Sequence, residues 1–151
     1  MRKEFARQLY ELMSTDDKIV LITADLGYLM LDKIKETYSD RFYNVGSAEQ
    51  TMIGVAIGLA LSNKIPVTYT ITPFYFRAFE QIRLYVDHEK IPIIMVASGR
   101  NNEYNAGFSH NASDHEILKN FKNIEFIVPE KEFNLSDIIY SGKPTYLNLK
   151  R

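Results

Sequence analysis

Cysteine is absent from this sequence of 151 residues, and histidine occurs only three times. The absence of cysteine excludes disulfide bonds, thiolate nucleophiles and thiolate metal sites. Positive and negative charges nearly cancel, giving a formal net charge of -1. This balance provides no electrostatic argument for binding to nucleic acid or to an anionic membrane. No segment approaches the ~18 apolar residues that a membrane-spanning helix needs.

The N-terminal residues are charged and lack the apolar run of a secretory signal peptide. We therefore expect a cytoplasmic protein. The length predicts a single domain over residues 1–151, which can bury roughly 70% of the surface that its unfolded chain exposes. Hydrophobic residues make up 46% of the chain, as is typical of a globular domain with a packed core.

Most motifs of familiar catalytic sites are also missing. The sequence has no GxGxxG after a strand, no P-loop, no GxSxG elbow and no histidine pair with the spacing of zinc ligands. His110 and His115 lie close together and could bind a metal ion, but no third ligand is evident. We therefore assign no metal site to this chain.

Helix-like and strand-like segments alternate along the chain. Helices are expected at residues 3–13, 29–38, 49–63, 74–88, 114–121 and 135–140. Continuous apolar, β-branched runs predict buried strands at residues 18–24, 41–45, 65–71, 91–98, 124–128 and 145–149. The alternation predicts an α/β fold, with a mostly parallel sheet flanked by helices on both faces.

Ligands of such sheets bind at the carboxyl ends of the strands. Four polar or aromatic segments fall at such ends: Asp25, residues 46–49, residues 72–77 and residues 99–113. The last of these has no periodicity, and an unstructured connection of this length in a compact domain is usually functional or mobile. The convergence predicts a site at this edge.

Residues 44–54 (NVGSAEQTMIG) read as a strand end, a glycine turn and the start of a helix. Glu49 lies at that start, where a carboxylate can simply complement the positive end of the helix dipole or serve a function. Small residues at alternate positions from Gly54 to Ala60 offer a smooth helix surface that another backbone could approach closely.

The same residues carry a family resemblance. Residues 44–54 resemble the pyrimidine-binding domain of transketolase-like thiamine diphosphate enzymes, especially the C-terminal subunits of split transketolases. Residues 72–83 (TPFYFRAFEQIR) are similar to the family's aromatic segment. The similarity continues through residues 24–26, 107–110 and 144–151, and so covers essentially the whole chain in order. It implies the thiamine diphosphate-binding fold of the pyrimidine type.

The resemblance implies that Glu49 hydrogen-bonds N1′ of the cofactor's aminopyrimidine ring and activates thiamine diphosphate. Phe74, with Phe76 or Phe79, would stack on or wall that ring, although core packing explains each phenylalanine as well. Arg77 matches an arginine beside the cofactor in deoxyxylulose-phosphate synthases.

Asp25 matches an aspartate near the thiazolium ring; a helix cap is the other interpretation. His110 matches a histidine that faces the substrate and the reaction centre. Arg2 and Arg151 match positions that help to hold a sugar phosphate in transketolases, but either could be a solvated surface charge.

Two departures from the family bear on function. The family's third, C-terminal domain is missing, and so is the GDG and asparagine signature that binds the magnesium diphosphate. A separate diphosphate-binding subunit is therefore expected to supply the ligands of Mg²⁺. Residues 27–30 and 99–106 also differ from the transketolase pattern, which leaves the substrate open.

The expected function is that of one subunit of a two-component transketolase-like transferase, which moves a two-carbon ketol unit between sugars. Self-association across a two-fold axis near residues 49–63 would give a heterotetramer of two such chains and two partners. One alternative is decarboxylation of a 2-oxo acid followed by ligation to an aldehyde, as in deoxyxylulose-phosphate synthases. The other is a non-catalytic, degenerate pyrimidine domain.

Overall fold

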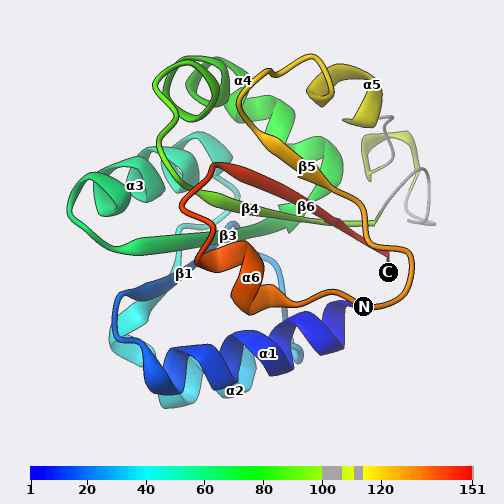
Figure 1. Ribbon diagram of the computed structural model, residues 1–151. Coiled ribbons are helices and arrows are strands. Elements are labelled where there is room, and N and C mark those ends of the chain that lie inside the picture. The colour runs from blue at the N-terminus through cyan, green and yellow to red at the C-terminus, as the bar shows by residue number, and fades with distance from the viewer. Residues whose placement is uncertain (100–106, 111–113, 151) are drawn as a thin grey trace.

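A computed structural model describes residues 1–99, 107–110 and 114–150, and for residues 114 and 115 the backbone alone (Figure 1). Six strands form one sheet in which every pairing is parallel, in the order β2-β1-β3-β4-β6-β5. The strands are β1 (Ile19–Thr23), β2 (Phe42–Asn44), β3 (Ile65–Ile71), β4 (Ile94–Ser98), β5 (Glu125–Ile127) and β6 (Thr145–Leu149). The expected fold class is confirmed.

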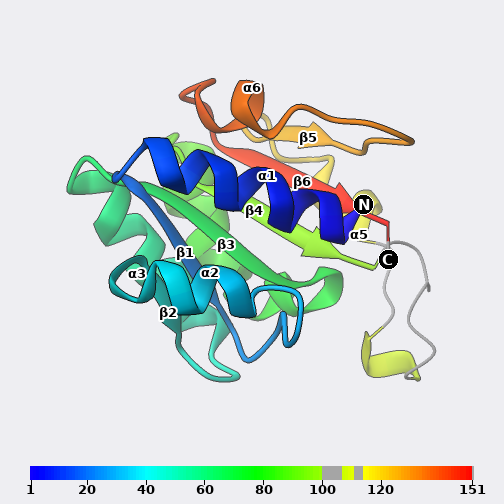
Figure 2. The same ribbon diagram turned by 90° about the horizontal axis from the view of Figure 1, so that it is seen from below.

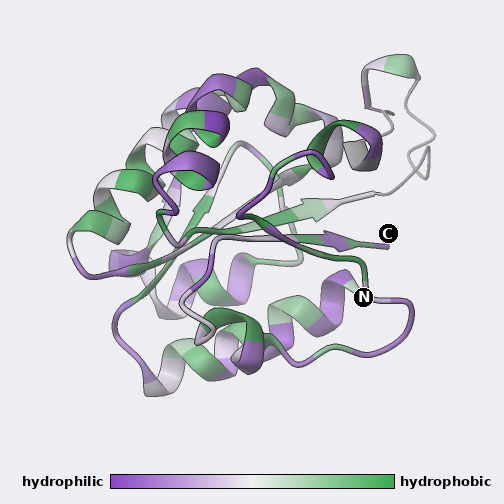
Figure 3. Ribbon diagram, turned by 45° about the horizontal axis from the view of Figure 1, so that its top comes forward, coloured by the Kyte–Doolittle hydropathy of each residue, from purple (hydrophilic) through white to green (hydrophobic). Residues whose placement is uncertain are grey.

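Helices cover both faces of the sheet (Figures 1 and 2). One face carries α1 (Arg2–Thr15), α2 (Asp32–Thr37) and α6 (Leu135–Ile139); the other carries α3 (Glu49–Leu61) and the helical segment of residues 72–88. Helix α1 alternates between polar and apolar residues along its length (Figure 3), as an amphipathic surface helix should. Within the described residues, we find no helix that is long and apolar enough to span a membrane.

The core has two halves because successive strand residues point to opposite faces. In β1, Ile19 and Leu21 pack toward α1, whereas Val20 and Ile22 pack toward α3. All five residues of β1 are buried, and the same holds for β4 and β6. This two-sided burial explains why the strands read as continuous apolar runs in the sequence.

Two helical segments differ from the sequence prediction. The helix expected from residue 29 begins at Asp32, because Leu29 has φ of 62°, in the left-handed region that an α-helix cannot include. Residues 74–88 do not form one regular helix. The 3-10 turns of η2 (Thr72–Ala78) lead through α4 (Phe79–Gln81) into η3 (Ile82–His88), which is wound as a π-helix.

The carboxyl ends of the central strands lie level with one another. Thr23 of β1 pairs with Asn44 of β2 on one side and with Tyr69 of β3 on the other. The chain leaves β1 toward β2 and leaves β3 toward β4, so the order of the sheet reverses between β1 and β3. Such a switch point opens a crevice where α/β proteins bind ligands.

Candidate functional site

Glu49 is the first residue of α3, and only 2% of it is exposed. The turn before it is tightly held: Val45 N–H donates to Thr23 O at 3.0 Å, and Ala48 N–H donates to Gly46 O at 2.7 Å. Gly46 has φ of 73°, which glycine adopts without strain. The turn thus places a carboxylate inside the protein at the positive end of a helix.

Arg77 of η2 is the ion-pair partner of Glu49. Its Nη1 atom donates to both carboxylate oxygens, at 2.8 and 2.9 Å. The guanidinium also lies over the ring of Phe74, 4.2 Å from its centroid, and that ring contacts His110 with centroids 5.2 Å apart. Four residues that sequence similarity placed at the cofactor or substrate therefore form one continuous chain of contacts.

The other two candidate aromatic residues lie apart from this chain of contacts. Phe76 is half-buried and packs against the core on the α3 side of the sheet. Phe79 is partly exposed, and its ring lies 5.5 Å from that of Phe121. Of the three phenylalanines, Phe74 is thus the one in contact with Arg77 and His110.

Tyr75 anchors the η2 segment to the sheet. Its hydroxyl lies 2.9 Å from Thr68 Oγ1, 3.2 Å from Thr68 O and 3.1 Å from Val96 O, in a position with no exposure to solvent. Burial raises the pKa of this hydroxyl well above its usual value of 10. The network fixes the residue between Phe74 and Arg77 and so holds both of them in place.

Asp25 is exposed and follows β1 with φ of 54°. Its backbone N–H donates to Asn44 Oδ1 at 2.9 Å, and the same oxygen accepts from Gly46 N–H at 3.0 Å. Sequence reasoning gave Asn44 no role. A signal was present, because asparagine at a strand end often bonds the backbone two residues on.

The remaining candidates are placed as follows. His110 ends η4 (Phe108–His110), with Nδ1 2.9 Å from Ser109 Oγ. Arg2 lies in the first turn of α1, whereas Arg151 is outside the described residues. In the described part of the chain, no group of three or more His, Asp or Glu side chains could hold a metal ion.

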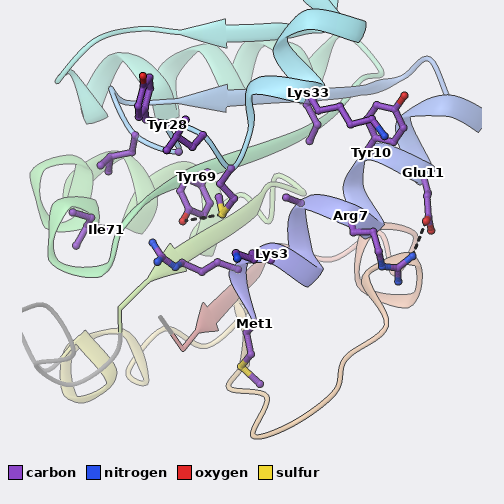
Figure 4. Close-up of a pocket in the computed structure, with 16 residues that line it drawn as sticks. Met1, Lys3, Arg7, Tyr10, Glu11, Tyr28, Lys33, Tyr69 and Ile71 are labelled. Carbon is purple, nitrogen blue, oxygen red and sulfur yellow. Dashed lines mark hydrogen bonds and ion pairs between the residues drawn. The ribbon is translucent and has the colours of Figure 1, made fainter.

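A cavity of about 970 Å³ opens at the switch point between β1 and β3 (Figure 4). Its walls come from α1, the loop after β1, the start of α2 and the end of β3. The lining residues are Met1, Arg2, Lys3, Ala6, Arg7, Tyr10, Glu11, Leu26, Gly27, Tyr28, Leu29, Met30, Lys33, Ile34, Tyr69 and Ile71. Four of these have cationic side chains and one has a carboxylate, so the cavity favours anionic ligands.

The cations of the cavity are held differently. Arg7 is paired with Glu4 and with Glu11, and its hydrogen bonds lower the pKa of Glu4 to about 2. Lys33 instead places Nζ 3.9 Å from the centroid of the Tyr10 ring, a cation–π contact visible in Figure 4. Arg7 is thus largely neutralised by carboxylates, whereas Lys33 keeps its charge facing the cavity.

The residues present fit the pyrimidine half of thiamine diphosphate. A buried carboxylate at a helix start can accept a hydrogen bond from a ring nitrogen, and the adjacent phenylalanine offers an aromatic face. Because Arg77 is half-exposed, the carboxylate can be reached from the carboxyl edge of the sheet. Glu49, Phe74, Arg77 and Asp25 are the residues that would hold the ring and its neighbour.

Comparisons with known proteins agree with this geometry. The profile of the family described as "Transketolase, pyrimidine binding domain" matches residues 1–142. A putative transketolase C-terminal section from Methanocaldococcus jannaschii is 32% identical; the alignment covers 100% of this chain and 50% of that protein. The 6-deoxy-6-sulfo-D-fructose transketolase subunit SqwH of a Clostridium species is 31% identical over 100% of this chain and 49% of its own length.

A solved structure described as "Split gene transketolase, inactive beta4 tetramer" superposes with a TM-score of 0.84 at 30% identity, over 99% of this chain and 51% of the other. Transketolase from Leishmania mexicana has the same fold, with a TM-score of 0.87 at 22% identity, over 99% of this chain and 25% of its own. This chain thus spans about half the length of its split-transketolase relatives. From the matched profile, the shared fold and the carboxylate that begins α3, we conclude that the chain belongs to the transketolase pyrimidine-binding domain family.

Proposed function

We propose that this chain is the pyrimidine-binding subunit of a two-component, thiamine diphosphate-dependent transferase, which moves a two-carbon ketol unit between sugars. One observation carries the proposal: a carboxylate buried at the start of α3 is joined through Arg77 to Phe74 and His110. A degenerate domain would have no need for a buried charge beside an aromatic ring, because such a charge costs stability.

When bound, thiamine diphosphate supplies a nucleophilic carbon that breaks and forms bonds next to a carbonyl group. Glu49 would hold a proton at N1′ of the aminopyrimidine ring, and Phe74 would pack against the ring. Arg77 would set the position of the Glu49 carboxylate, and Asp25 would lie near the thiazolium ring. His110 would move protons to and from substrate oxygens, which is the usual role of a histidine at a reaction centre.

A separate subunit would bind the diphosphate and supply the ligands of Mg²⁺. The names of two relatives support this division, because one is a transketolase C-terminal section and the other is called a subunit. The assembled enzyme is proposed to work in the cytoplasm.

Self-association through α3 is proposed for the same assembly, which would be a heterotetramer. Gly54 and Gly58 have open space around the position of a missing Cβ atom, and Val55 and Leu61 on the same helix are exposed. A small-residue helix surface with exposed apolar side chains suits close packing against a second copy. The similar split-gene transketolase structure is described as a beta4 tetramer, which supports self-association of this kind of chain.

The substrate is proposed to be a sugar that carries an acidic group. The cationic cavity at the switch point contains Arg2, which agrees with a role for Arg2 in holding a sugar phosphate. Arg151 is proposed for the same role. The names of two relatives refer to sulfo- and phospho-sugars.

One alternative reaction has a specific observation in its favour. A 1-deoxy-D-xylulose-5-phosphate synthase from Gloeobacter violaceus is 31% identical over 91% of this chain and 22% of its own length. Decarboxylation of a 2-oxo acid would follow the same use of Glu49, so the two reactions differ in their substrates.

The test is to isolate the tagged chain with its partner and to assay the pair with thiamine diphosphate and Mg²⁺. Ketol transfer from a ketose phosphate to an aldose phosphate is the expected result. Release of carbon dioxide from pyruvate, without ketol transfer, would favour the alternative. If the assembled pair bound the cofactor and catalysed neither reaction, the proposed function would be wrong.

A further inference from the structure

Asn44 ends β2, and its side chain joins two loops of the proposed site. Its Oδ1 atom accepts hydrogen bonds from Asp25 N–H at 2.9 Å and from Gly46 N–H at 3.0 Å. Asp25 follows β1, whereas Gly46 lies in the turn three residues before Glu49. One side-chain oxygen therefore bonds to the loop of each proposed cofactor carboxylate.

Both donors belong to residues with left-handed backbone. Asp25 has φ of 54° and Gly46 has φ of 73°. A residue other than glycine is uncommon in this region and needs contacts that hold it there. The bond from Asp25 N–H to Asn44 supplies such a contact, so Asn44 helps to keep Asp25 in its unusual conformation.

The position of Gly46 is passed on to Glu49. Gly46 O accepts from Ala48 N–H at 2.7 Å, and Ala48 is the residue that caps α3. Ala48 has no side-chain hydrogen bond of its own to the helix. A shift of Gly46 would therefore move the first turn of α3, and the Glu49 carboxylate with it.

We propose that Asn44 is a positioning residue, whose carboxamide oxygen fixes the separation between Asp25 and the first turn of α3. This inference rests on the proposed function, because it assumes that Asp25 and Glu49 meet the same cofactor. Asn44 itself would touch no reacting atom. The role needs an oxygen acceptor at this length of side chain, which aspartate also offers and leucine does not.

Three variants test the proposal. Asn44→Leu keeps the approximate shape and removes the acceptor, and Asn44→Asp keeps the acceptor. Asn134→Leu is a matched control, because Asn134 is an exposed residue whose Oδ1 accepts from Ser136 N–H at 3.0 Å, at the start of α6 and outside the proposed site.

The first measurement is amide hydrogen exchange of the free chain by NMR. Asn44→Leu is expected to speed exchange at both Asp25 and Gly46 by about tenfold, as the loss of a typical hydrogen bond would. Asn44→Asp should leave both amides protected, and Asn134→Leu should affect Ser136 alone. Unchanged exchange at Asp25 and Gly46 in Asn44→Leu would overturn the proposal.

The second measurement is the affinity of the assembled enzyme for thiamine diphosphate. Asn44→Leu should weaken it about tenfold, while Asn44→Asp and Asn134→Leu stay within about threefold of wild type. Equal affinity of wild type and Asn44→Leu would overturn the positioning role alone. Failure of the wild-type pair to bind the cofactor would instead overturn the proposed function, and the exchange data would still decide whether Asn44 joins the two loops.

Discussion

Arg77 binds both carboxylate oxygens of Glu49 from one side, while its own guanidinium reaches solvent. The side chain of Glu49 is 1% exposed and that of Arg77 is 51% exposed. The pair therefore connects a charge inside the protein to the surface at the carboxyl edge of the sheet. Any ligand that approaches Glu49 from this edge meets Arg77 and Phe74 on the way.

The first prediction concerns this ion pair. Arg77→Leu leaves the Glu49 carboxylate buried without its cation, which should lower the free energy of unfolding by about 1–2 kcal/mol. This is below the range for fully buried pairs because Arg77 is half-exposed. Urea denaturation of the free chain measures the effect.

The control is Arg83→Leu, which breaks the exposed pair of Arg83 with Glu80. That change should cost about 0.5 kcal/mol or less. The double variant Glu49→Gln with Arg77→Leu should regain part of the lost stability, because no buried charge remains. Equal losses for Arg77→Leu and Arg83→Leu would show that the burial of Glu49 does not depend on Arg77.

The second prediction addresses catalysis by Glu49. Glu49→Gln keeps the shape of the side chain and removes the acid, so the turnover of the assembled enzyme should fall by at least about 100-fold. Glu36→Gln, an exposed change on α2, serves as the control and should leave turnover unchanged. Steady-state rates of ketol transfer provide the measurement. Similar turnover of the two variants would refute an acid role for Glu49.

A third prediction follows from the buried hydroxyl of Tyr75. Its pKa is raised in the folded protein by burial, so above pH 10 the unfolded chain loses this proton before the folded one does. The stabilisation is therefore complete below pH 10 and is lost as the pH rises above it. We expect the free energy of unfolding to fall above pH 10, with a smaller slope in Tyr75→Phe.

At neutral pH, Tyr75→Phe should cost about 1–3 kcal/mol, because its partners at Thr68 and Val96 stay buried. Tyr85→Phe is the control: Tyr85 is 44% exposed, and the change should stay within about 0.5 kcal/mol. Urea titrations between pH 7 and pH 11 measure both effects. Identical slopes for wild type and Tyr75→Phe would contradict this explanation of the η2 anchor.

The strands could be predicted from sequence because burial on both faces leaves uninterrupted apolar runs. The irregular winding of residues 72–88 could not, since it depends on how Tyr75 and its neighbours pack between strands and α3. Nor could the left-handed Leu29, because leucine disfavours that conformation. The pairing of Glu49 with Arg77, 28 residues apart, needed the three-dimensional structure.

The fourth prediction separates the role of His110 from cofactor binding. His110→Ala should lower turnover by about 100-fold and change the affinity for thiamine diphosphate by less than about threefold, because its expected contact is with the substrate. His88→Ala, at the exposed end of η3, is the control and should alter neither quantity. Parallel loss of affinity and turnover in His110→Ala would place this residue at the cofactor instead.

The central claim is that this chain provides one half of a shared cofactor site. Calorimetric titration of thiamine diphosphate with Mg²⁺ into the chain alone, the partner alone and their complex tests this claim most directly. We predict tight binding by the complex only, abolished or strongly weakened by Glu49→Gln in this chain. Tight binding by the chain alone would contradict the claim.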